Sequence, residues 1–341
     1  MKKIGLAFLA FFCFGTIITS CKPDINLFAE YKDITIVYSI LDSDNDTNFV
    51  KINKVFMDPD MQILPNDSIN YPGKLDARIV EYKANIHSSH YTQTRELILD
   101  TITIHNKVPG SFEYPDQLVY YTTEKIHGND EYSDYKYELQ IHKNDTVITA
   151  ETYIVGGSRF IIVNGVVNFD HAVTASPRCV EFYECPNGAM YELVFRFDFS
   201  EITTSNDTIP RNVSWSLGTF TKNDLELTMN QNKYRIPYNS SDFFYKISKA
   251  IDTTDNTIVE RVFFKDPITI TVASCGIELY NFITINGPST SISQTIPDYT
   301  NVNGGYGVFS SRTMVSKAVK LGGQTIPELE KRENWRFRQA E

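Results

Sequence analysis

Strict alternation of apolar and polar residues constrains this chain more than any other feature of its sequence. The clearest run is 191–199, where Tyr, Leu and Phe at the odd positions alternate mainly with charged residues. A period of two sends successive side chains to opposite faces of a strand, so such a run forms a strand with one buried face. Similar runs occur at 34–40, 135–141 and 268–272. We therefore predict a mainly β fold.

Turn residues separate the strand-like runs, which recur about every 10 to 15 residues, a spacing typical of β-sandwiches. The 341 residues leave room for roughly two domains after a leader. We predict two tandem β-sandwich (immunoglobulin-like) domains at 33–155 and 156–321. Short helices are expected in the second, near 242–250 and 276–283. The charged tail, 322–341, is expected to be a short exposed helix or a frayed end.

Tight turns are marked by an Asn-Asp-Ser/Thr pattern that occurs at 45–47, 66–68, 144–146 and 206–208. Asn and Asp favour turns, and the β-branched residues that follow favour the start of a strand. A further turn signal, Asn-Gly at 164–165, lies between two short apolar runs. This signal predicts a tight hairpin at that point.

Five hydroxyl side chains that follow an aspartate support a second hypothesis. Asp-Ser/Thr before an apolar residue or threonine resembles the acceptor motif for O-glycosylation of exported proteins in Bacteroidetes-type bacteria. The candidate acceptors are Ser68, Thr101, Thr146, Thr208 and Thr253. Turn chemistry alone explains most of the pattern, and it remains the alternative.

The N-terminus has the layout of a secretory leader. Two lysines follow Met1, and Ile4–Ile18 is almost wholly apolar but shorter than the roughly 20 residues that span a bilayer. The sequence Ile-Thr-Ser-Cys ending at Cys21 resembles the bacterial lipobox, in which the cysteine thiol forms a thioether to a lipid that carries two acyl chains, such as palmitate. We expect residues 1–20 to be a signal peptide, Cys21 to carry lipid and 21–32 to be a tether. The alternative is an ordinary signal peptide with an incidental cysteine.

The charge balance excludes some partners. The chain has 32 basic and 42 acidic residues and a net charge of −10, and loss of the two leader lysines makes the mature part more acidic still. Such a surface repels nucleic acid and anionic lipid. The sequence has no second long apolar run, so the lipid on Cys21 is the expected link to the membrane.

Three cysteines follow Cys21: Cys179, Cys185 and Cys275. Outside the cytoplasm disulfides persist, and Cys179 and Cys185 are close enough in sequence to close a small loop. Pairing of Cys275 with either of the other two stays open at this stage. A zinc site is less expected, because no clustered histidine accompanies the cysteines.

The sequence contains none of the common catalytic motifs: there is no Gly-x-Ser-x-Gly elbow, no P-loop and no Gly-x-Gly-x-x-Gly after a strand. We therefore expect no catalytic residues, no cofactor and no metal. Tyrosines are dense at 120–121 and 132–137. They are expected to fill a core, with stacking on a sugar or a protein partner as the alternative.

Three segments together resemble an uncharacterised lipoprotein family of Bacteroidetes-type bacteria, domain-of-unknown-function family 4249. They are an opening strand at 33–41, the paired strands 137–141 and 149–152, and the glycine-rich stretch 297–309. The resemblance implies an outer-membrane or cell-surface lipoprotein that works near nutrient transport systems. It supplies no catalytic residues.

We therefore expect a lipid-anchored protein of the outer membrane or cell surface that acts as a binding or accessory module. Its partner would be a glycan or an outer-membrane protein, such as a nutrient transporter. The first alternative is an adhesion or filament subunit, which would show a donor strand or an open groove. The second is a glycan-active enzyme, which would need two carboxylates about 5 to 10 Å apart in a cleft.

Overall fold

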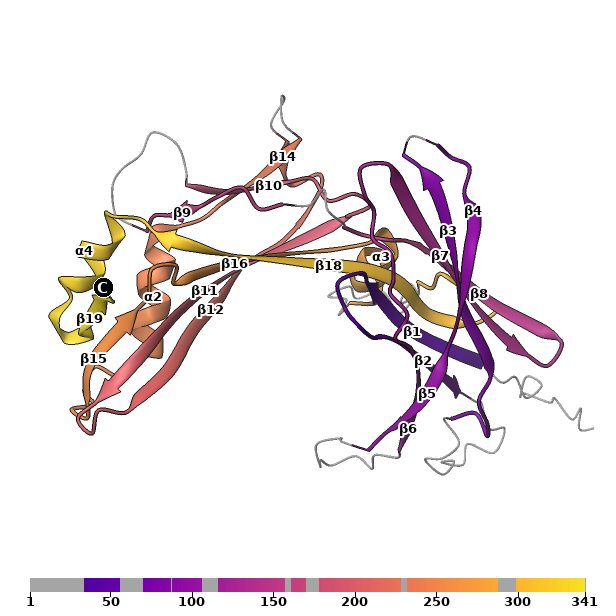
Figure 1. Cartoon of the computed structure of the whole chain (residues 1–341), viewed down its shortest axis with the longest axis horizontal. Coiled ribbons are helices and arrows are strands. Elements are labelled where there is room, and N and C mark those ends of the chain that lie inside the picture. Colours follow the sequence, from indigo (N-terminus) through magenta and orange to yellow (C-terminus); the bar gives the residue numbers. More distant parts are fainter. Residues whose placement is uncertain are drawn as a thin grey trace, which may run out of the picture. The chain divides into compact units, whose positions relative to one another are not determined.

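The computed structural model describes residues 34–55, 70–86, 88–105, 116–156, 161–169, 178–227, 232–287 and 299–340. All of them belong to one compact unit, Ile34–Val55 with Pro65–Glu341. The fold is mainly β, as the alternation predicts (Figure 1).

The strands among these residues are β1 (Ile34–Asp42), β2 (Asn48–Val55), β3 (Asp76–Asn85), β4 (Thr92–Ile98), β5 (Asp100–Ile104), β6 (Gln117–Thr122), β7 (Ser133–Lys143), β8 (Thr146–Tyr153), β9 (Val166–Val167), β10 (Cys179–Tyr183), β11 (Met190–Thr203), β12 (Thr208–Thr221), β13 (Glu226–Leu227), β14 (Lys233–Pro237), β15 (Ile258–Phe263), β16 (Ile268–Cys275), β17 (Val302–Asn303), β18 (Tyr306–Leu321) and β19 (Phe337–Gln339). The helical elements are α2 (Ser240–Ala250), α3 (Ile277–Asn286), α4 (Thr325–Glu330) and the 3₁₀ turn η2 (Glu333–Trp335). None of these helices is long and apolar enough to cross a membrane.

The strands form three sheets. The largest has eleven strands, of which nine follow the order β19-β15-β11-β16-β18-β1-β2-β6-β5, with β12 paired to β11 and β9 to β18. A five-stranded sheet has the order β17-β8-β7-β3-β4, and a three-stranded sheet has the order β10-β14-β13. All four runs whose alternation was strict in the sequence are strands: β1, β7, β11 and β16.

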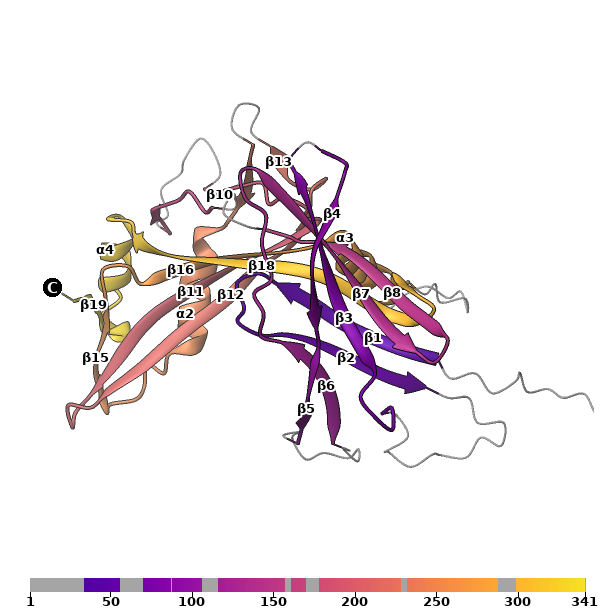
Figure 2. The same cartoon turned by 45° about the vertical axis from the view of Figure 1, so that its right-hand side comes forward.

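Strand β18 links the two ends of the chain. Its first part, Tyr306–Arg312, pairs in parallel with β1, and its second part pairs antiparallel with β16. The strand therefore lies between β16 and β1 in the sheet (Figure 2). At the β1 contact Gly307 has φ +110°, and a Cβ there would overlap the carbonyl oxygen of Val37. Only glycine combines this backbone angle with so close an approach.

The first hydrophobic core lies between the β1–β2–β6 part of the large sheet and the five-stranded sheet. Val37, Ile79 and Leu139 are buried there. Val302 and Phe309, from the far end of the chain, complete it. The proposed division of the chain near residue 155 stays a prediction, but this packing crosses it.

The second core is rich in aromatic residues. Helix α2 places Phe243, Phe244 and Ile247 on one face, a spacing that matches the helical repeat, and all three are buried. The Phe243 ring stacks on Phe169 at 4.4 Å between centroids. Alternate residues of β11, including Phe195, fill the other side of this core.

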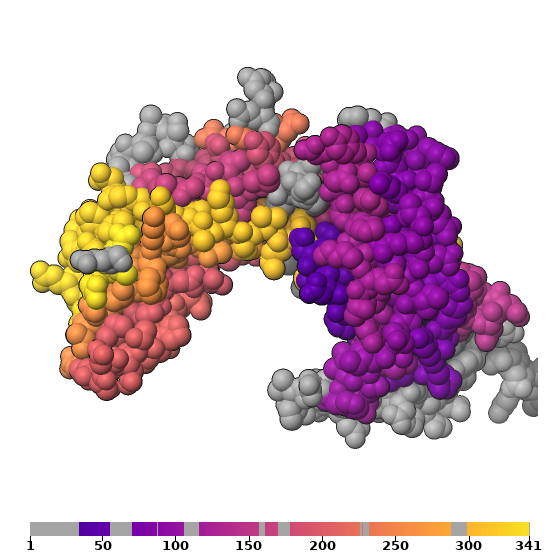
Figure 3. Space-filling model, viewed as in Figure 1, coloured from indigo at the N-terminus to yellow at the C-terminus, as the bar shows by residue number. Residues whose placement is uncertain are grey.

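The short helix expected in the tail is confirmed as α4, but the end of the chain packs into the second core, so the expectation that the tail is exposed or frayed is wrong. Leu329, Trp335 and Phe337 are buried, and β19 pairs with β15. In the space-filling view the yellow C-terminal part lies against orange residues of the second half of the chain (Figure 3). Arg261, only 1% exposed, donates to the Trp335 carbonyl oxygen at 3.0 Å and to the Glu201 carboxylate at 2.9 Å. Charged residues separate these apolar residues in the sequence, so no local pattern predicted that they are buried.

The other local predictions have mixed outcomes. The two helices expected in the second half of the chain are confirmed as α2 and α3. The Asn-Gly hairpin at 164–165 is wrong, because its two arms pair elsewhere. Ile162 bridges to Phe182, and β9 pairs with the end of β18.

Gly307→Ala should destabilise the protein by about 3 kcal/mol, because the new methyl group meets the Val37 carbonyl and the backbone angle disfavours any side chain. Urea unfolding measures the loss. Gly165→Ala is the matched control, since a methyl group at that position would have no atom within 4 Å. Equal stability of the two variants would contradict the tight β1–β18 contact.

Candidate functional site

A pocket of about 400 Å³ opens beside the first turn of α3. Its walls come from three turns and one helix. Tyr153 ends β8, 187–189 precede β11, and 221–223 comprise the last residue of β12 and the two that follow. Gly276 and the α3 residues Ile277, Glu278 and Tyr280 complete the lining.

The backbone around the pocket is held by specific hydrogen bonds. Asn187 adopts φ +60°, a left-handed angle that asparagine tolerates, and its Nδ2 donates to the Ile154 carbonyl at 3.0 Å. Gly276 caps α3, and its carbonyl accepts from the Tyr280 N–H at 3.0 Å. These contacts hold the turn at Asn187 and the start of α3, which both line the pocket.

Glu278 is the carboxylic acid of this pocket among the described residues that line it. Its Oε2 accepts hydrogen bonds from Thr152 Oγ1 at 3.1 Å and from Ser310 Oγ at 3.3 Å. Burial raises the pKa of Glu278, although these hydroxyls and its own N–H favour the charged form. A carboxyl group can accept about four hydrogen bonds, so capacity remains for a ligand.

A second pocket of about 410 Å³ adjoins the first through Asn187 and Lys222, which line both. Lys222 Nζ lies 2.7 Å from Glu184 Oε1, and both side chains are partly exposed. Tyr183 lies in this second pocket. The two pockets therefore share a wall that carries an amide and an ion pair.

Aromatic side chains stand beside these polar groups. Tyr153 is 42% exposed and packs edge-on against Tyr91, with ring centroids 5.7 Å apart. Tyr280, which is half-buried on α3, also lines the first pocket. A lining that combines tyrosine rings, amide groups and a carboxyl group suits a ligand that has both apolar faces and hydroxyl groups.

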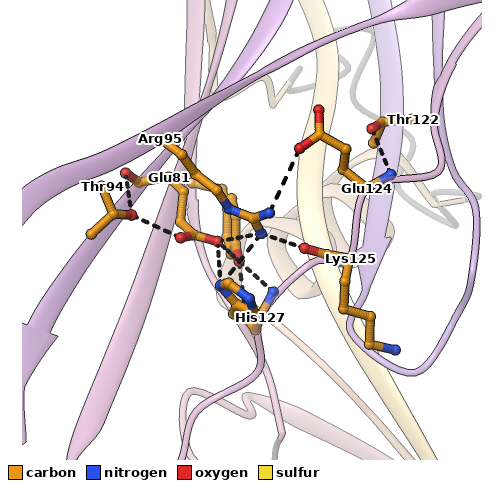
Figure 4. A network of polar contacts seen from close by, with 8 residues as sticks. Glu81, Thr94, Arg95, Thr122, Glu124, Lys125 and His127 are labelled. Atoms are coloured by element: carbon orange, nitrogen blue, oxygen red, sulfur yellow. Dashed lines mark hydrogen bonds and ion pairs between the residues drawn. The ribbon is translucent and has the colours of Figure 1, made fainter.

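A second polar cluster surrounds Glu81 on β3 (Figure 4). The Glu81 side chain is 2% exposed and accepts from Thr94 Oγ1 at 2.7 Å, Arg95 Nη2 at 2.7 Å and Tyr137 OH at 2.8 Å. His127 Nδ1 lies 3.0 Å from the same carboxylate. Arg95 also donates to the Lys125 carbonyl, so the cluster ties the 123–132 segment to the five-stranded sheet.

The Glu81 cluster is internally satisfied. Burial opposes ionisation of Glu81, but the hydrogen bonds from Arg95, Thr94 and Tyr137 outweigh it and lower the pKa. Burial raises the pKa of Tyr137 far above its usual range, with the Glu81 charge adding to the effect. Each carboxylate oxygen already has partners, so we assign this cluster a role in stability.

The sequence-predicted lipidation and modification sites are only partly described. Cys21 and Ser68 lie outside the described residues. Thr146 and Thr208 are exposed at the starts of β8 and β12, while Thr101 and Thr253 are half-buried. Their modification stays a prediction.

The turn interpretation of the Asn-Asp-Thr pattern is confirmed where the structure describes it. The segment 45–47 joins β1 to β2. Asn144 and Asn206 have positive φ in the hairpins β7–β8 and β11–β12.

The structure does not join Cys179 to Cys185. Cys179 opens β10 and Cys185 lies two residues beyond its end, and neither forms a disulfide with a described residue. Cys185 and Cys275 are buried thiols. Burial raises the pKa of Cys185 to about 12 and that of Cys275 to about 11.

Other outcomes concern residues that sequence reasoning passed over or left open. Tyr120, Tyr135 and Tyr137 are buried, which confirms their core role, whereas Tyr132 is exposed. Glu278 was not among the site residues predicted from the sequence. It is the only charged residue between Cys275 and Gly287, and this isolation is the sequence signal that could have identified it. Within the described part of the chain no group of three or more His, Cys, Asp or Glu has the arrangement of a metal site.

Glu278→Gln should stabilise the protein at neutral pH. A raised folded-state pKa means that ionisation destabilises the fold as pH rises above the unfolded value of about 4.3. Urea unfolding at pH 4 and pH 8 checks this: the variant gains stability over wild type at pH 8 and the difference fades at pH 4. The exposed Glu131→Gln is the control, and an equal gain there would refute the assignment.

Glu81→Gln should cost about 2 kcal/mol at pH 7, because it replaces charge-assisted hydrogen bonds. Because the pKa of Glu81 is lowered in the folded protein, its ionised carboxylate stabilises the fold above about pH 4.3. This stabilisation is lost as the pH falls through the folded-state pKa. Thermal unfolding from pH 7 down to pH 3 should therefore show wild type converging on the variant. Glu96→Gln, at a partly exposed ion pair, should change little.

A comparison with models of known protein families finds no match to this chain, and a comparison with curated proteins finds none either.

Proposed function

We propose that this protein is a lipid-anchored module of the bacterial outer membrane or cell surface that binds a glycan in the Glu278 pocket. The observation that carries the proposal is the placement of Tyr153 and Tyr280 beside Asn187 and Glu278 around one open pocket. The anchor rests on the lipobox-like sequence that ends at Cys21.

A sugar ring matches the pocket in two ways. Its C–H faces are apolar and stack on aromatic rings, which Tyr153 and Tyr280 supply. Its hydroxyl groups both donate and accept hydrogen bonds, and they meet an amide at Asn187 and a carboxyl group at Glu278. The volume of about 400 Å³ lies within the range of small-ligand sites.

The electrostatics favour an uncharged glycan. Lys222 is neutralised by Glu184 at 2.7 Å, and burial holds the pKa of Glu278 above its usual range. The whole chain carries a net charge of −10, which repels anionic ligands at long range. A neutral oligosaccharide is not repelled by the net negative charge and needs no charged partner in the pocket.

An anchored binding module of this kind fits an accessory role beside an outer-membrane nutrient transporter. Cys21 would hold the chain on the membrane through two or three acyl chains, since one chain alone gives only reversible binding. The pocket would then collect glycan close to the transporter.

Tyr280→Ala should weaken glycan binding about tenfold, which corresponds to about 1.4 kcal/mol of lost stacking. Screening the unlipidated mature chain on a glycan array identifies a ligand, and titration calorimetry compares the variants. Tyr245→Ala, a 59% exposed tyrosine on α2, is the matched control and should bind as wild type does. If no glycan binds, or if both variants lose the same affinity for the glycan, the proposal that this pocket binds glycan is wrong.

Cys21→Ser should abolish membrane attachment, because the thiol that forms the lipid thioether is gone. Incorporation of labelled palmitate, membrane fractionation and mass spectrometry of the mature N-terminus measure the outcome. Cys275→Ser keeps Cys21 and should remain membrane-bound. A mature protein whose first residue is an unmodified cysteine would end the lipoprotein proposal.

A further inference from the structure

Strand β12 leaves a long edge of the large sheet open. It has 14 residues, against seven in β4 and five in β5, and among the described residues it pairs with β11 alone (Figure 1). A strand edge presents backbone N–H and C=O groups that another extended chain can pair with.

The β11–β12 hairpin fixes which residues point outward along this edge. The Thr203 N–H donates to the Asp207 carbonyl at 3.0 Å, and Thr208 pairs with Ile202. Because hydrogen-bonded and non-hydrogen-bonded pairs alternate, even-numbered residues of β12 turn their backbone groups away from β11. Pro210 agrees with this assignment, since it has no N–H to offer β11.

Three outward-facing residues form an uncharged segment: Asn212, Ser214 and Ser216. Their side chains are exposed on the wet face of the sheet, while Val213 and Trp215 between them are buried, and the Trp215 ring packs against Phe243 of α2. No charged residue occurs from Asn212 to Thr221.

The two ends of this segment are blocked. Pro210 cannot donate a hydrogen bond. At the other end Gly218 has φ +113° in the bulge that follows Ser216. The open segment is therefore short and has defined limits.

We propose that β12 pairs antiparallel with β12 of a second copy of this chain, with Ser214 opposite Ser214. In this register Asn212 of each copy faces Ser216 of the other, and about six backbone hydrogen bonds form. The contact is two-fold symmetric, the commonest arrangement in homodimers.

The segment is complementary to itself in this register. Arg211, the nearest charge, lies opposite Leu217, so no like charges meet. Pro210 lies opposite Gly218, so the blocked ends of the two copies coincide. A longer or unrelated strand would run past these ends, where the edge offers no regular pairing. This makes a second copy the partner that fits.

Disulfide trapping tests the register in the unlipidated mature chain, so it is independent of the lipid and of the glycan pocket. Directly opposed residues in an antiparallel pair lie about 4.5 to 5.5 Å apart between Cα atoms, within disulfide range. Under mild oxidation Ser214→Cys should give a cross-linked dimer in good yield. Ser248→Cys, an exposed serine on α2, is the control for random collision. Cross-linking no greater than in the control would overturn the proposal.

Light scattering over a range of protein concentrations gives a second readout. Ser214→Lys places two ammonium groups opposite each other and should weaken dimerisation about tenfold or more. Ser214→Gln adds similar bulk without charge and should leave the dimer intact. Circular dichroism confirms that both variants are folded. A wild type that stays monomeric at every concentration, or equal dimerisation of the Lys and Gln variants, would exclude this interface.

Discussion

The parallel pairing of β1 with β18 is the contact on which the rest of the structure depends. Asp42 and Arg312 are 270 residues apart in sequence, yet their side chains lie 3.4 Å apart at the end of this pairing. Gly307 permits the close approach to Val37, and Phe309 two residues later enters the first core. The second part of the same strand carries Val319 into the second core. One strand thus contributes to both cores.

The buried charges of this protein divide into two kinds. Glu81 and Arg261 are almost inaccessible and have several hydrogen-bond partners each, as expected for charges that stabilise a fold. Glu278 is held by two hydroxyl groups and lines an open pocket, and burial raises its pKa. A carboxyl group that the fold only partly satisfies is the better candidate for contact with a ligand.

Local patterns predicted the secondary structure well, because alternation and turn chemistry act over a few residues. The runs that became β7 and β11 and the left-handed Asn144 and Asn206 are examples. Features that depend on distant partners were not predictable. The arms of the 164–165 turn found partners at Phe182 and at the end of β18, which no local signal indicates.

The candidate site shows the same division. The lipidation proposed at Cys21 rests on neighbouring residues alone, so the sequence was enough to suggest it. The Glu278 pocket is assembled from turns near 153, 187 and 222 that come together only in the fold. The tail was misjudged for a related reason: Trp335 and Phe337 sit among charged residues, and their burial depends on Arg261, more than 70 residues earlier.

The β1–β18 pairing also sets the order of events during synthesis. A domain built from consecutive strands can fold as soon as it leaves the ribosome or a translocation channel. Here β1 has no β18 beside it until almost the entire polypeptide has emerged, and contacts of such high sequence separation form slowly. During that interval the early strands expose their apolar faces. Loss of the last strands would therefore reach the beginning of the chain too, because it would take the parallel neighbour from β1 and Phe309 from the first core.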